Sequence, residues 1–286
     1  MKNISKKIFA CSIVFAMLLG LFSASMPVQA NEDDCTNYVS INLSTGEEEI
    51  IPISNTATET EAAGYTPAGA KQPRLIIGID DRIPVSDTSY DPYPKVGLIR
   101  TTWRNGVTTT GTGWMFGPND VATVAHNLYS AERGGAAQSI QYYPAYNPGH
   151  IPYGVLTARN IIICEDFVTQ DDSQYDYGVF DLNNNVGNST GYFGWNSNVI
   201  PNSVVASIGY PEDYHTQMVH SFGDVYNVYS NYFTHSIDTL AGDSGAPVLF
   251  GSSVIGIHSG STSILNTATR ISGSVANLLQ NRRLAP

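Results

Sequence analysis

Cysteine is scarce in this sequence of 286 residues, which holds three. Cys11 lies in a predicted leader and Cys35 in a predicted pro-segment, so Cys164 alone is left for the mature protein. A disulfide within the mature protein is therefore excluded, and we expect packing to stabilise the fold. In the run "NIIICED", Cys164 is interpreted as a small buried apolar residue rather than a catalytic thiol.

Long apolar runs are also missing, and none approaches the roughly 20 residues that a membrane-spanning helix needs. The chain opens with lysines, continues through an apolar stretch from Ile8 to Phe22, and reaches the sequence "VQA" at Ala30. This order is typical of a secretory signal peptide, residues 1–30, that is cut after Ala30. We therefore predict a secreted, extracellular protein that no membrane retains.

Basic residues are few, because 14 Lys and Arg stand against 25 Asp and Glu, which gives a net charge of −11. Residues 75–286 hold nine of these bases and seventeen of the acids. A chain of this charge is repelled by phosphate backbones and anionic lipids. We therefore expect neither nucleic acid nor a membrane surface as a partner.

Residues 31–74 are poor in core-forming side chains. Three glutamates stand together at 47–49, threonine and alanine follow, and "PAGAKQPR" ends the segment at Arg74. We interpret residues 31–74 as a propeptide, and we predict that another protease makes the last cut, after Arg74. The 212 residues that remain suit one large β domain or two small packed barrels.

Short apolar runs separated by Gly, Pro, Asn and Asp fill the remaining chain. Eleven are strand candidates: "KVGLIRTTW", "TGTGWMFG", "DVATVAH", "SIQYYPAY", "GVLTARNIII", "YDYGVFDL", "VVASIGYP", "MVHSFGDVYNVY", "YFTHSID", "APVLFG" and "SVIGIHSG". Only "SVANLLQNRR" near the end has helical spacing. The "NNNVGN" stretch at 183–188 is the best internal boundary. The pattern predicts an all-β fold in two halves, 75–186 and 187–286, with a short C-terminal helix.

The segment "GDSGAPV", residues 242–248, carries the first candidate for chemistry. Ser244 lies between glycines in a loop that leads into an apolar strand, which can expose its hydroxyl and bring backbone N–H groups near a substrate carbonyl. Taken alone, the motif is equally compatible with a turn serine before a strand. A strand-to-helix nucleophile elbow is excluded, because Ala246 replaces its second glycine and no helix follows.

A serine nucleophile needs a base, and the base needs an orienting group. His126 ends the run "DVATVAH" and Asp176 begins the run "YDYGVFDL". By themselves, they would be a satisfied core histidine and a capping aspartate. The order His126, Asp176, Ser244 is, however, that of chymotrypsin-like hydrolases. Because the first two residues fall in the first half and the third in the second, a cleft between two barrels would bring them together.

Five motifs in order resemble the secreted glutamyl endopeptidase branch of the chymotrypsin-like (trypsin-like) serine proteases: "GTGWMFGPNDVATVAHNLY", "YDYGVFDL", "TGYFGW", "IGYPED" and "DTLAGDSGAPV". The resemblance implies a double β-barrel with six strands in each barrel. It also implies that His126 is the general base, Asp176 its orienting group and Ser244 the nucleophile. The backbone N–H groups of Gly242 and Ser244 would form the oxyanion hole. We expect protein or peptide substrates, a monomer, and neither a cofactor nor a metal ion.

The sequence departs from these relatives at two positions. Asn127 stands where many of them have a disulfide cysteine after the histidine, so packing must hold that loop. Asp243 stands where glutamyl endopeptidases often have an uncharged amide. In trypsin-like zymogens an aspartate there pairs with the newly freed α-amino group, and "PR" before "LIIG" resembles such an activation site. We therefore hypothesise a pair between the Leu75 amine and Asp243, with a solvated turn aspartate as the alternative.

Two features compete for the primary specificity pocket. In glutamyl endopeptidases the residues that match His258 and Thr239 contact the substrate glutamate, and Ser261 is a third candidate. Asp238, six residues before Ser244, matches the aspartate that gives trypsin its Arg and Lys preference. The histidine favours cleavage after Glu, and less readily after Asp. Trypsin-like specificity is the alternative.

A different class of function also stays open, because a protease fold can serve as an inactive secreted binding protein. The complete set of triad and oxyanion residues favours the enzyme. Three further histidines, His215, His220 and His235, are separated by five and fifteen residues, which matches no common zinc pattern. We interpret them as surface or strand residues.

Overall fold

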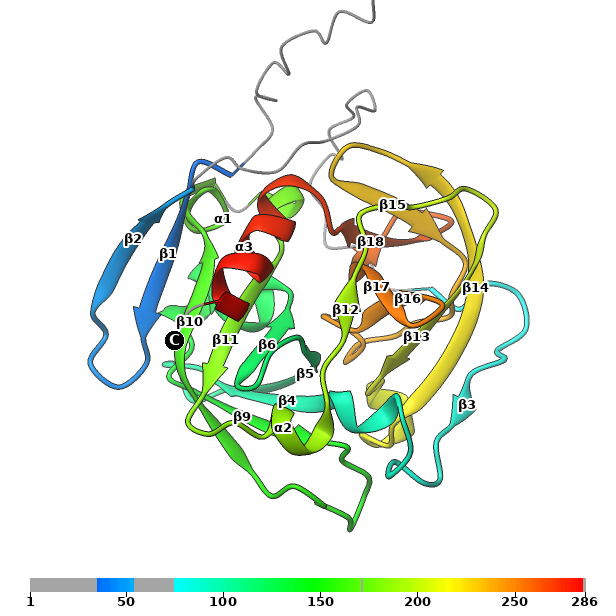
Figure 1. Cartoon of the computed structure of the whole chain (residues 1–286), viewed down its shortest axis with the longest axis horizontal. Coiled ribbons are helices and arrows are strands. Elements are labelled where there is room, and N and C mark those ends of the chain that lie inside the picture. Colours follow the sequence, from blue (N-terminus) through cyan, green and yellow to red (C-terminus); the bar gives the residue numbers. More distant parts are fainter. Residues whose placement is uncertain (1–34, 54–74, 171, 285–286) are drawn as a thin grey trace, which may run out of the picture. The chain divides into compact units, whose positions relative to one another are not determined.

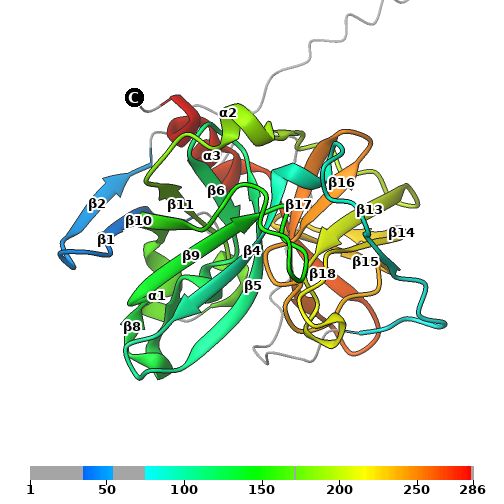
Figure 2. The same cartoon turned by 90° about the horizontal axis from the view of Figure 1, so that it is seen from below.

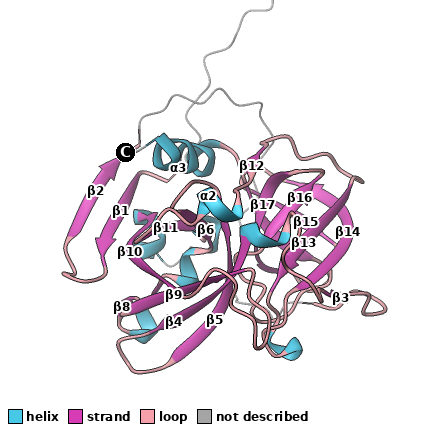
Figure 3. Cartoon of the chain, turned by 60° about the horizontal axis from the view of Figure 1, so that its bottom comes forward, coloured by secondary structure: helices cyan, strands magenta, loops and turns pink. Residues whose placement is uncertain are grey.

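The computed structural model describes residues 35–53, 75–170 and 172–284, all within a compact unit that spans residues 32–286 (Figure 1). The predicted signal peptide, residues 1–30, and residues 54–74 of the predicted propeptide lie outside the described residues. Among the described residues, no helix is long and apolar enough to cross a membrane. Strands dominate, and the helices are short (Figure 3).

The first barrel is a closed ring of six antiparallel strands. They are β4 (Val96–Thr102), β5 (Thr108–Met115), β6 (Asp120–Thr123), β9 (Ser139–Pro144), β10 (Leu156–Cys164) and β11 (Gly178–Leu182). Strand β10 closes the ring, because it pairs with β9 at its start and with β11 further along. Since alternate side chains point inward, Ile99, Trp114 and Phe180 are fully buried.

The second barrel has the same plan. Its strands are β13 (Val204–Gly209), β14 (Val219–Val228), β15 (Tyr232–His235), β16 (Pro247–Phe250), β17 (Ser253–Ser261) and β18 (Asn266–Arg270), and the β17–β18 pairing closes it. Two short strands join from outside: β12 (Gly194–Trp195) runs parallel to β17, and β3 (Ile83–Pro84) pairs with β14. Val225, Phe233 and Ile255 fill the core.

The two barrels confirm the expected all-β double barrel, and all eleven predicted runs contain barrel strands. Strand β18 is the one barrel strand that the sequence pattern does not predict. Its sequence, "NTATR", has one apolar residue, yet Asn266 and Ala268 are completely buried. Because buried polar residues such as Asn266 form hydrogen bonds inside the barrel, this strand lacks the alternation of apolar and polar residues by which the others were predicted.

The remaining elements are short. Helices α1 (Glu165–Gln170) and α2 (Gly187–Thr190) and strands β7 (Tyr129–Ser130) and β8 (Gly135–Ala136) belong to connections. Single 3-10 turns lie at Tyr93–Lys95, Ala125–Asn127, Ala131–Arg133, Ser173–Tyr175 and Glu212–Tyr214. His126 lies in the second of these turns, and Asp176 directly follows the fourth.

Helix α3 (Gly273–Leu284) confirms the predicted C-terminal helix. Although it follows the last strand of the second barrel, it packs against the first, where Figure 1 shows it in front of β11. The Tyr177 hydroxyl donates to Ser274 Oγ at 2.9 Å. Arg282 Nη2 lies 3.3 Å from Asp181 Oδ2 and 3.6 Å from Asp120 Oδ1. The end of the chain therefore ties back to the first barrel.

An N-terminal hairpin extends the first barrel. Strand β1 (Asn37–Asn42) pairs antiparallel with β10, and β2 (Glu48–Pro52) pairs with β1 at the outer edge, as Figures 1 and 2 both show. Tyr38, Val39 and Ile41 are almost completely buried. Residues 35–53 thus contribute to a core, contrary to the interpretation that residues 31–74 are poor in core-forming side chains.

A disulfide joins Cys35 to Cys164. The expectation that packing alone stabilises the fold is therefore wrong. The register explains the bond, because Tyr38 lies opposite Cys164 and brings the start of the hairpin to the end of β10. Cys164 is buried, as expected, but as half of a cystine.

Candidate active site

His126 and Asp176 are brought together by the pairing of β6 with β11. His126 lies in the 3-10 turn that follows β6, and Asp176 ends the turn that precedes β11. The Asp176 carboxylate accepts the backbone N–H of His126 at 2.9 Å and lies 2.6 Å from its Nδ1. Two contacts to one carboxylate fix both the backbone and the ring of the histidine.

Ser244 completes the constellation from the second barrel. Its Oγ lies 2.6 Å from His126 Nε2, so the three predicted residues form a continuous hydrogen-bonded chain. The Ser244 carbonyl accepts the Thr112 N–H of strand β5 at 2.8 Å. A strand of the first barrel therefore holds the serine against the histidine.

Asn127 has a role that the sequence did not reveal. Its side-chain amide donates to Thr123 Oγ1 at 2.9 Å and to the Ser244 carbonyl at 3.0 Å. The loop after His126 is therefore held by polar contacts, and one of them crosses directly to the serine. The one signal in the sequence for this role is that Asn127 stands where many relatives have a cysteine.

The loop around Ser244 requires glycine on both sides. Gly242 has φ +98°, and a Cβ there would lie 2.2 Å from the Tyr210 carbonyl oxygen. Gly245 has φ +89°, and its Cβ would lie 2.1 Å from Thr123 Oγ1. Larger residues would strain the backbone and displace the serine. This explains the glycines of the "GDSG" motif.

His258 lies on β17 beside the serine loop. Its carbonyl accepts the Gly245 N–H and its own N–H donates to the Ala246 carbonyl, both at 2.8 Å. Its Nδ1 lies 3.4 Å from Nε2 of His235. Burial lowers the pKa of His235 to about 3, so that ring is neutral at physiological pH. His235 is the strand residue that we expected, but its place behind His258 was not predicted.

Thr239 contacts the first residue of the predicted mature chain, and Ser261 pairs with another residue that contacts it. The Thr239 N–H donates to the Leu75 carbonyl at 3.3 Å, and Asn266 Nδ2 donates to the same carbonyl at 2.8 Å. Ser261 lies opposite Asn266 in the β17–β18 register. Thr239 is 1% exposed, and its hydroxyl has no hydrogen-bond partner among the described residues. A buried donor of this kind is suited to a ligand.

Leu75 and Asp243, the hypothesised activation pair, are not brought together. The Leu75 N–H donates to Asn266 Oδ1 at 3.0 Å, and the Asp243 carboxylate accepts the Leu240 N–H of its own loop at 2.9 Å. Because Leu75 is joined to Arg74 in this chain, its nitrogen is an amide and not a charged amine. Asn266 is therefore the partner that the sequence reasoning missed.

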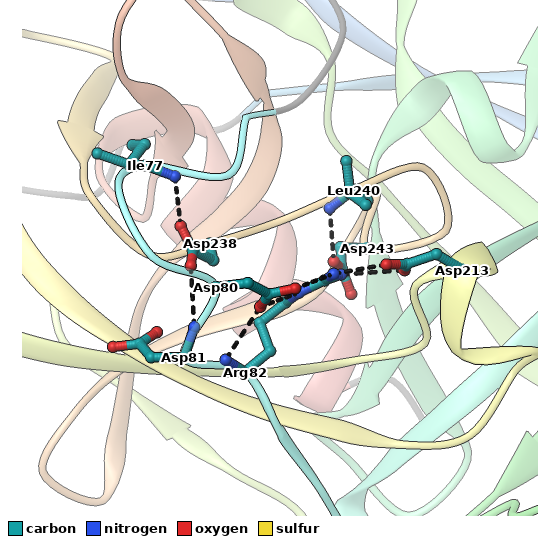
Figure 4. Close-up of polar contacts among 8 residues, drawn as sticks. All are labelled: Ile77, Asp80, Asp81, Arg82, Asp213, Asp238, Leu240 and Asp243. Atoms are coloured by element: carbon teal, nitrogen blue, oxygen red, sulfur yellow. Dashed lines mark hydrogen bonds and ion pairs between the residues drawn. The ribbon is translucent and has the colours of Figure 1, made fainter.

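Asp238 binds the start of the predicted mature chain (Figure 4). Its carboxylate accepts the Ile77 N–H at 2.6 Å and the Asp81 N–H at 3.4 Å. The residue is 3% exposed, and burial raises the pKa of its carboxyl. Both carboxylate oxygens thus already have backbone donors.

Arg82 forms a second anchor of the same segment, also drawn in Figure 4. Its guanidinium contacts the carboxylates of Asp80 and Asp213, and its Cζ lies 4.8 Å from the ring centre of Tyr214. Asp213 belongs to the 3-10 turn 212–214, and the Glu212 N–H of that turn donates to the Ala241 carbonyl at 2.7 Å. The arginine therefore connects the start of the predicted mature chain to the loop beside Gly242.

One group of described residues has the ligand spacing of a metal site: Cys35, Cys164 and Asp166. Its two sulfurs are bonded to each other, so they are not thiolate ligands in this state. His215, His220 and His235 do not belong to it.

Comparisons with known proteins agree with this geometry. The family model described as "Trypsin-like peptidase domain" matches residues 111–257. A glutamyl endopeptidase of Bacillus licheniformis is 31% identical over 245 residues, which are 78% of this chain and 74% of that protein. A protein of Bacillus subtilis named extracellular metalloprotease is 31% identical over 225 residues, 73% of this chain and 70% of that protein.

Solved structures show the same fold. A Glu endopeptidase in complex with MPD superposes with a TM-score of 0.67 at 23% identity, over 74% of this chain and all of that one. The protease Anisep from Arthrobacter nicotinovorans superposes with a TM-score of 0.59 at 21% identity, over 69% of this chain and 99% of that one.

Proposed function

This chain belongs to the trypsin-like serine peptidases, within their glutamyl endopeptidase branch, and we propose that it is secreted and hydrolyses peptide bonds after glutamate. Its membership of this family makes it a serine endopeptidase. The hydrogen-bonded chain from Asp176 through His126 to Ser244 carries the proposal for the mechanism. The leader-like first 30 residues, and a relative whose name contains the word extracellular, support export.

The proposed reaction has two halves. His126 Nε2 takes the Ser244 hydroxyl proton while Oγ attacks the scissile carbonyl, and the N–H groups of Gly242 and Ser244 stabilise the oxyanion. Collapse of this intermediate passes the proton to the leaving amine and leaves an acyl-enzyme. Water then attacks with the same base, which releases the acid and restores the serine. Throughout, Asp176 holds the histidine ring and stabilises its charged form.

The contacts of Asp238 support glutamate over arginine or lysine. A carboxylate that selects a cationic side chain must be able to contact it in the pocket. Here the backbone N–H groups of Ile77 and Asp81 already bind that carboxylate. A substrate ammonium group in their place would remove the hydrogen bond of the half-buried Ile77 N–H and that of the exposed Asp81 N–H, and bonds to a charged group are worth about 1.5–3 kcal/mol each.

His258 and Thr239 are the proposed ligands of the substrate carboxylate, with Ser261 as the third. If His235 donates from Nε2 to His258 Nδ1, the proton of His258 is on Nε2, which can then donate to an anion. The Thr239 hydroxyl adds a second donor. Neutral donors recognise a carboxylate without the desolvation cost of a buried ammonium group.

Cleavage-site mapping tests this specificity. The mature enzyme is incubated with an unfolded protein that contains Glu, Asp, Arg and Lys, and the products are identified by mass spectrometry. We expect cuts after Glu and fewer after Asp. Cuts mainly after Arg and Lys would refute the proposal and place Asp238 in the pocket.

A His258→Ala variant tests the pocket itself. Because a hydrogen bond to a charged group is worth about 1.5–3 kcal/mol, kcat/KM for Glu substrates should fall roughly ten- to a hundredfold. His150→Ala, in an exposed loop, is the matched control. An unchanged ratio of Glu to Arg cleavage in the His258 variant would remove that histidine from recognition.

Maturation is the remaining part of the proposal. We propose that cleavage after Arg74 requires another protease, since an enzyme specific for glutamate cuts poorly after arginine. A Ser244→Ala precursor, which cannot process itself, should release a chain that begins at Leu75 when it is treated with trypsin. Failure to release that chain would count against the site.

A further inference from the structure

Residues 35–53 have the contacts of a permanent part of the protein, although they lie inside the predicted propeptide. They are bonded to the first barrel through Cys35–Cys164. They also pair with β10 along five residues, from Tyr38 opposite Cys164 to Asn42 opposite Asn160. Tyr38, Val39 and Ile41 are at most 4% exposed. A segment that is released on activation would have to withdraw these side chains and break a covalent bond.

The predicted cut lies beyond this segment. Cleavage after Arg74, and trimming at Glu59 or Glu61, would all break the backbone after Ile53 and leave the disulfide intact. We propose that the active enzyme consists of two chains, in which the fragment that contains residues 35–53, here called the light chain, stays bonded to Cys164. Activation then removes no part of the hairpin.

The light chain also supports the segment that carries Asp176. The Thr36 N–H and hydroxyl both donate to Asp166 Oδ2, at 2.8 and 3.0 Å. The Asn37 amide donates to Glu165 Oε2 at 2.8 Å. Both acids are in the first turn of α1, which begins the stretch of chain from Cys164 to Asp176.

The far end of the same stretch is held by a second group of contacts. The Tyr38 hydroxyl donates to the Ser274 carbonyl, and Ser274 Oγ accepts the hydroxyl of Tyr177 at 2.9 Å. Tyr177 directly follows Asp176. The light chain is thus a positioning element for the aspartate, a consequence that rests on the proposed catalytic role of Asp176.

Trypsin treatment of the Ser244→Ala precursor tests the two-chain state without any need for activity. No Lys or Arg lies between Asn31 and Ala70, so trypsin leaves the light chain whole. In denaturing electrophoresis, the light chain and the chain that begins at Leu75 should migrate together without reductant and separately with it. In a Cys35→Ser control they should separate in both conditions. A chain from Leu75 that migrates alone without reductant, with a free Cys164 thiol, would overturn the proposal.

Kinetics of the two-chain enzyme test the positioning role. Reduction followed by removal of the light chain should lower kcat about tenfold or more, because His126 loses a fixed partner. KM for a Glu peptide should change by less than about twofold, since the proposed pocket is in the second barrel. Thr36→Val should shift kcat in the same direction, whereas Glu49→Gln, at an exposed site, should not.

The outcomes separate the claims. Full kcat without the light chain would refute the positioning role while the electrophoresis result stands. Absence of any peptidase activity in the intact enzyme would refute the proposed mechanism, and again would not affect the disulfide-linked migration of the Ser244→Ala protein.

Discussion

The chain contributes one segment ahead of β4 to each barrel, and the two segments are held in different ways. Residues 35–53 join the first barrel through a disulfide, strand pairing and buried apolar side chains. Residues 75–85 join the second mainly through polar contacts, in which Asn266 binds Leu75, Asp238 binds Ile77 and Arg82 binds Asp213. The predicted cleavage site, after Arg74, lies between the two segments.

The difference assigns the two segments different roles. The disulfide and the apolar contacts of residues 35–53 do not depend on whether the chain is cut after residue 74. The hairpin therefore has a structural role before and after that cut. The polar contacts begin at Leu75, the residue that would become the new N-terminus, which Asn266 and the Thr239 N–H contact. The second segment is therefore the one through which the proposed cleavage after Arg74 would act on the proposed active site.

Loss of the disulfide should have the largest effect on stability. The bond joins residues that are 129 positions apart, so it strongly restricts the unfolded chain. In a Ser244→Ala precursor, Cys35→Ser with Cys164→Ser should lower the free energy of unfolding by about 2–5 kcal/mol in urea. The unsubstituted precursor in reductant should follow the same curve. Equal stability with and without the bond would mean that the disulfide does not stabilise the first barrel, so that the two segments would not differ in this respect.

Loss of the Asp238 carboxylate should be the next largest effect, and it should act on the other segment. Asp238→Asn weakens two charge-assisted hydrogen bonds, worth about 1.5–3 kcal/mol each, and kcat/KM for Glu peptides should fall on the order of tenfold. Asp224→Asn, at an exposed site of β14, is the control. Loss of cleavage after Arg or Lys, with Glu cleavage unchanged, would instead mean that Asp238 binds substrate.

The sequence predicted the parts of the fold and site that have short-range signals. Alternating apolar runs indicated eleven of the twelve barrel strands, and "GDSG" predicted a loop whose backbone requires glycine at 242 and 245. The order of His126, Asp176 and Ser244 suggested the residues that the fold joins through two contacts of 2.6 Å, one on each ring nitrogen of His126.

Contacts between distant segments could not be predicted in the same way. The pairing of β1 with β10 depends on a register across more than 100 residues, so Cys35 was assigned to a segment apart from Cys164. Asn266 lies in a polar strand without an apolar pattern, and its link to Leu75 exists only once the second barrel closes. Asp238 resembled a pocket residue because sequence position does not show which backbone N–H groups a carboxylate will meet.

A smaller effect is expected at Arg82, the outer anchor of the second segment. Its partners Asp80 and Asp213 have side chains that are 40% exposed, so solvent screens part of the interaction. Arg82→Met should lower the free energy of unfolding by about 1–2 kcal/mol. Arg82→Lys should recover only part of this loss, because lysine cannot contact both carboxylates in the same planar geometry. If Arg82→Lys had the full free energy of unfolding of the unsubstituted protein, the positive charge alone would account for the contribution of Arg82.

The last effect depends on pH and concerns charge in the first barrel, where Arg282 of α3 contacts Asp120. Burial raises the pKa of Asp120 to about 6 from its usual 3.8. The folded state therefore binds this proton more tightly than the unfolded state, and the stability gained below pH 4 is lost as the pH rises to 6. Relative to Asp120→Asn, the unsubstituted protein should lose about 1–3 kcal/mol across this interval. Urea unfolding of both proteins at pH 4, 5, 6 and 7 measures the difference. If the difference in unfolding free energy between the two proteins were the same at all four pH values, Arg282 would keep the Asp120 carboxylate ionised. A polar contact would then stabilise the first barrel, as polar contacts stabilise the second.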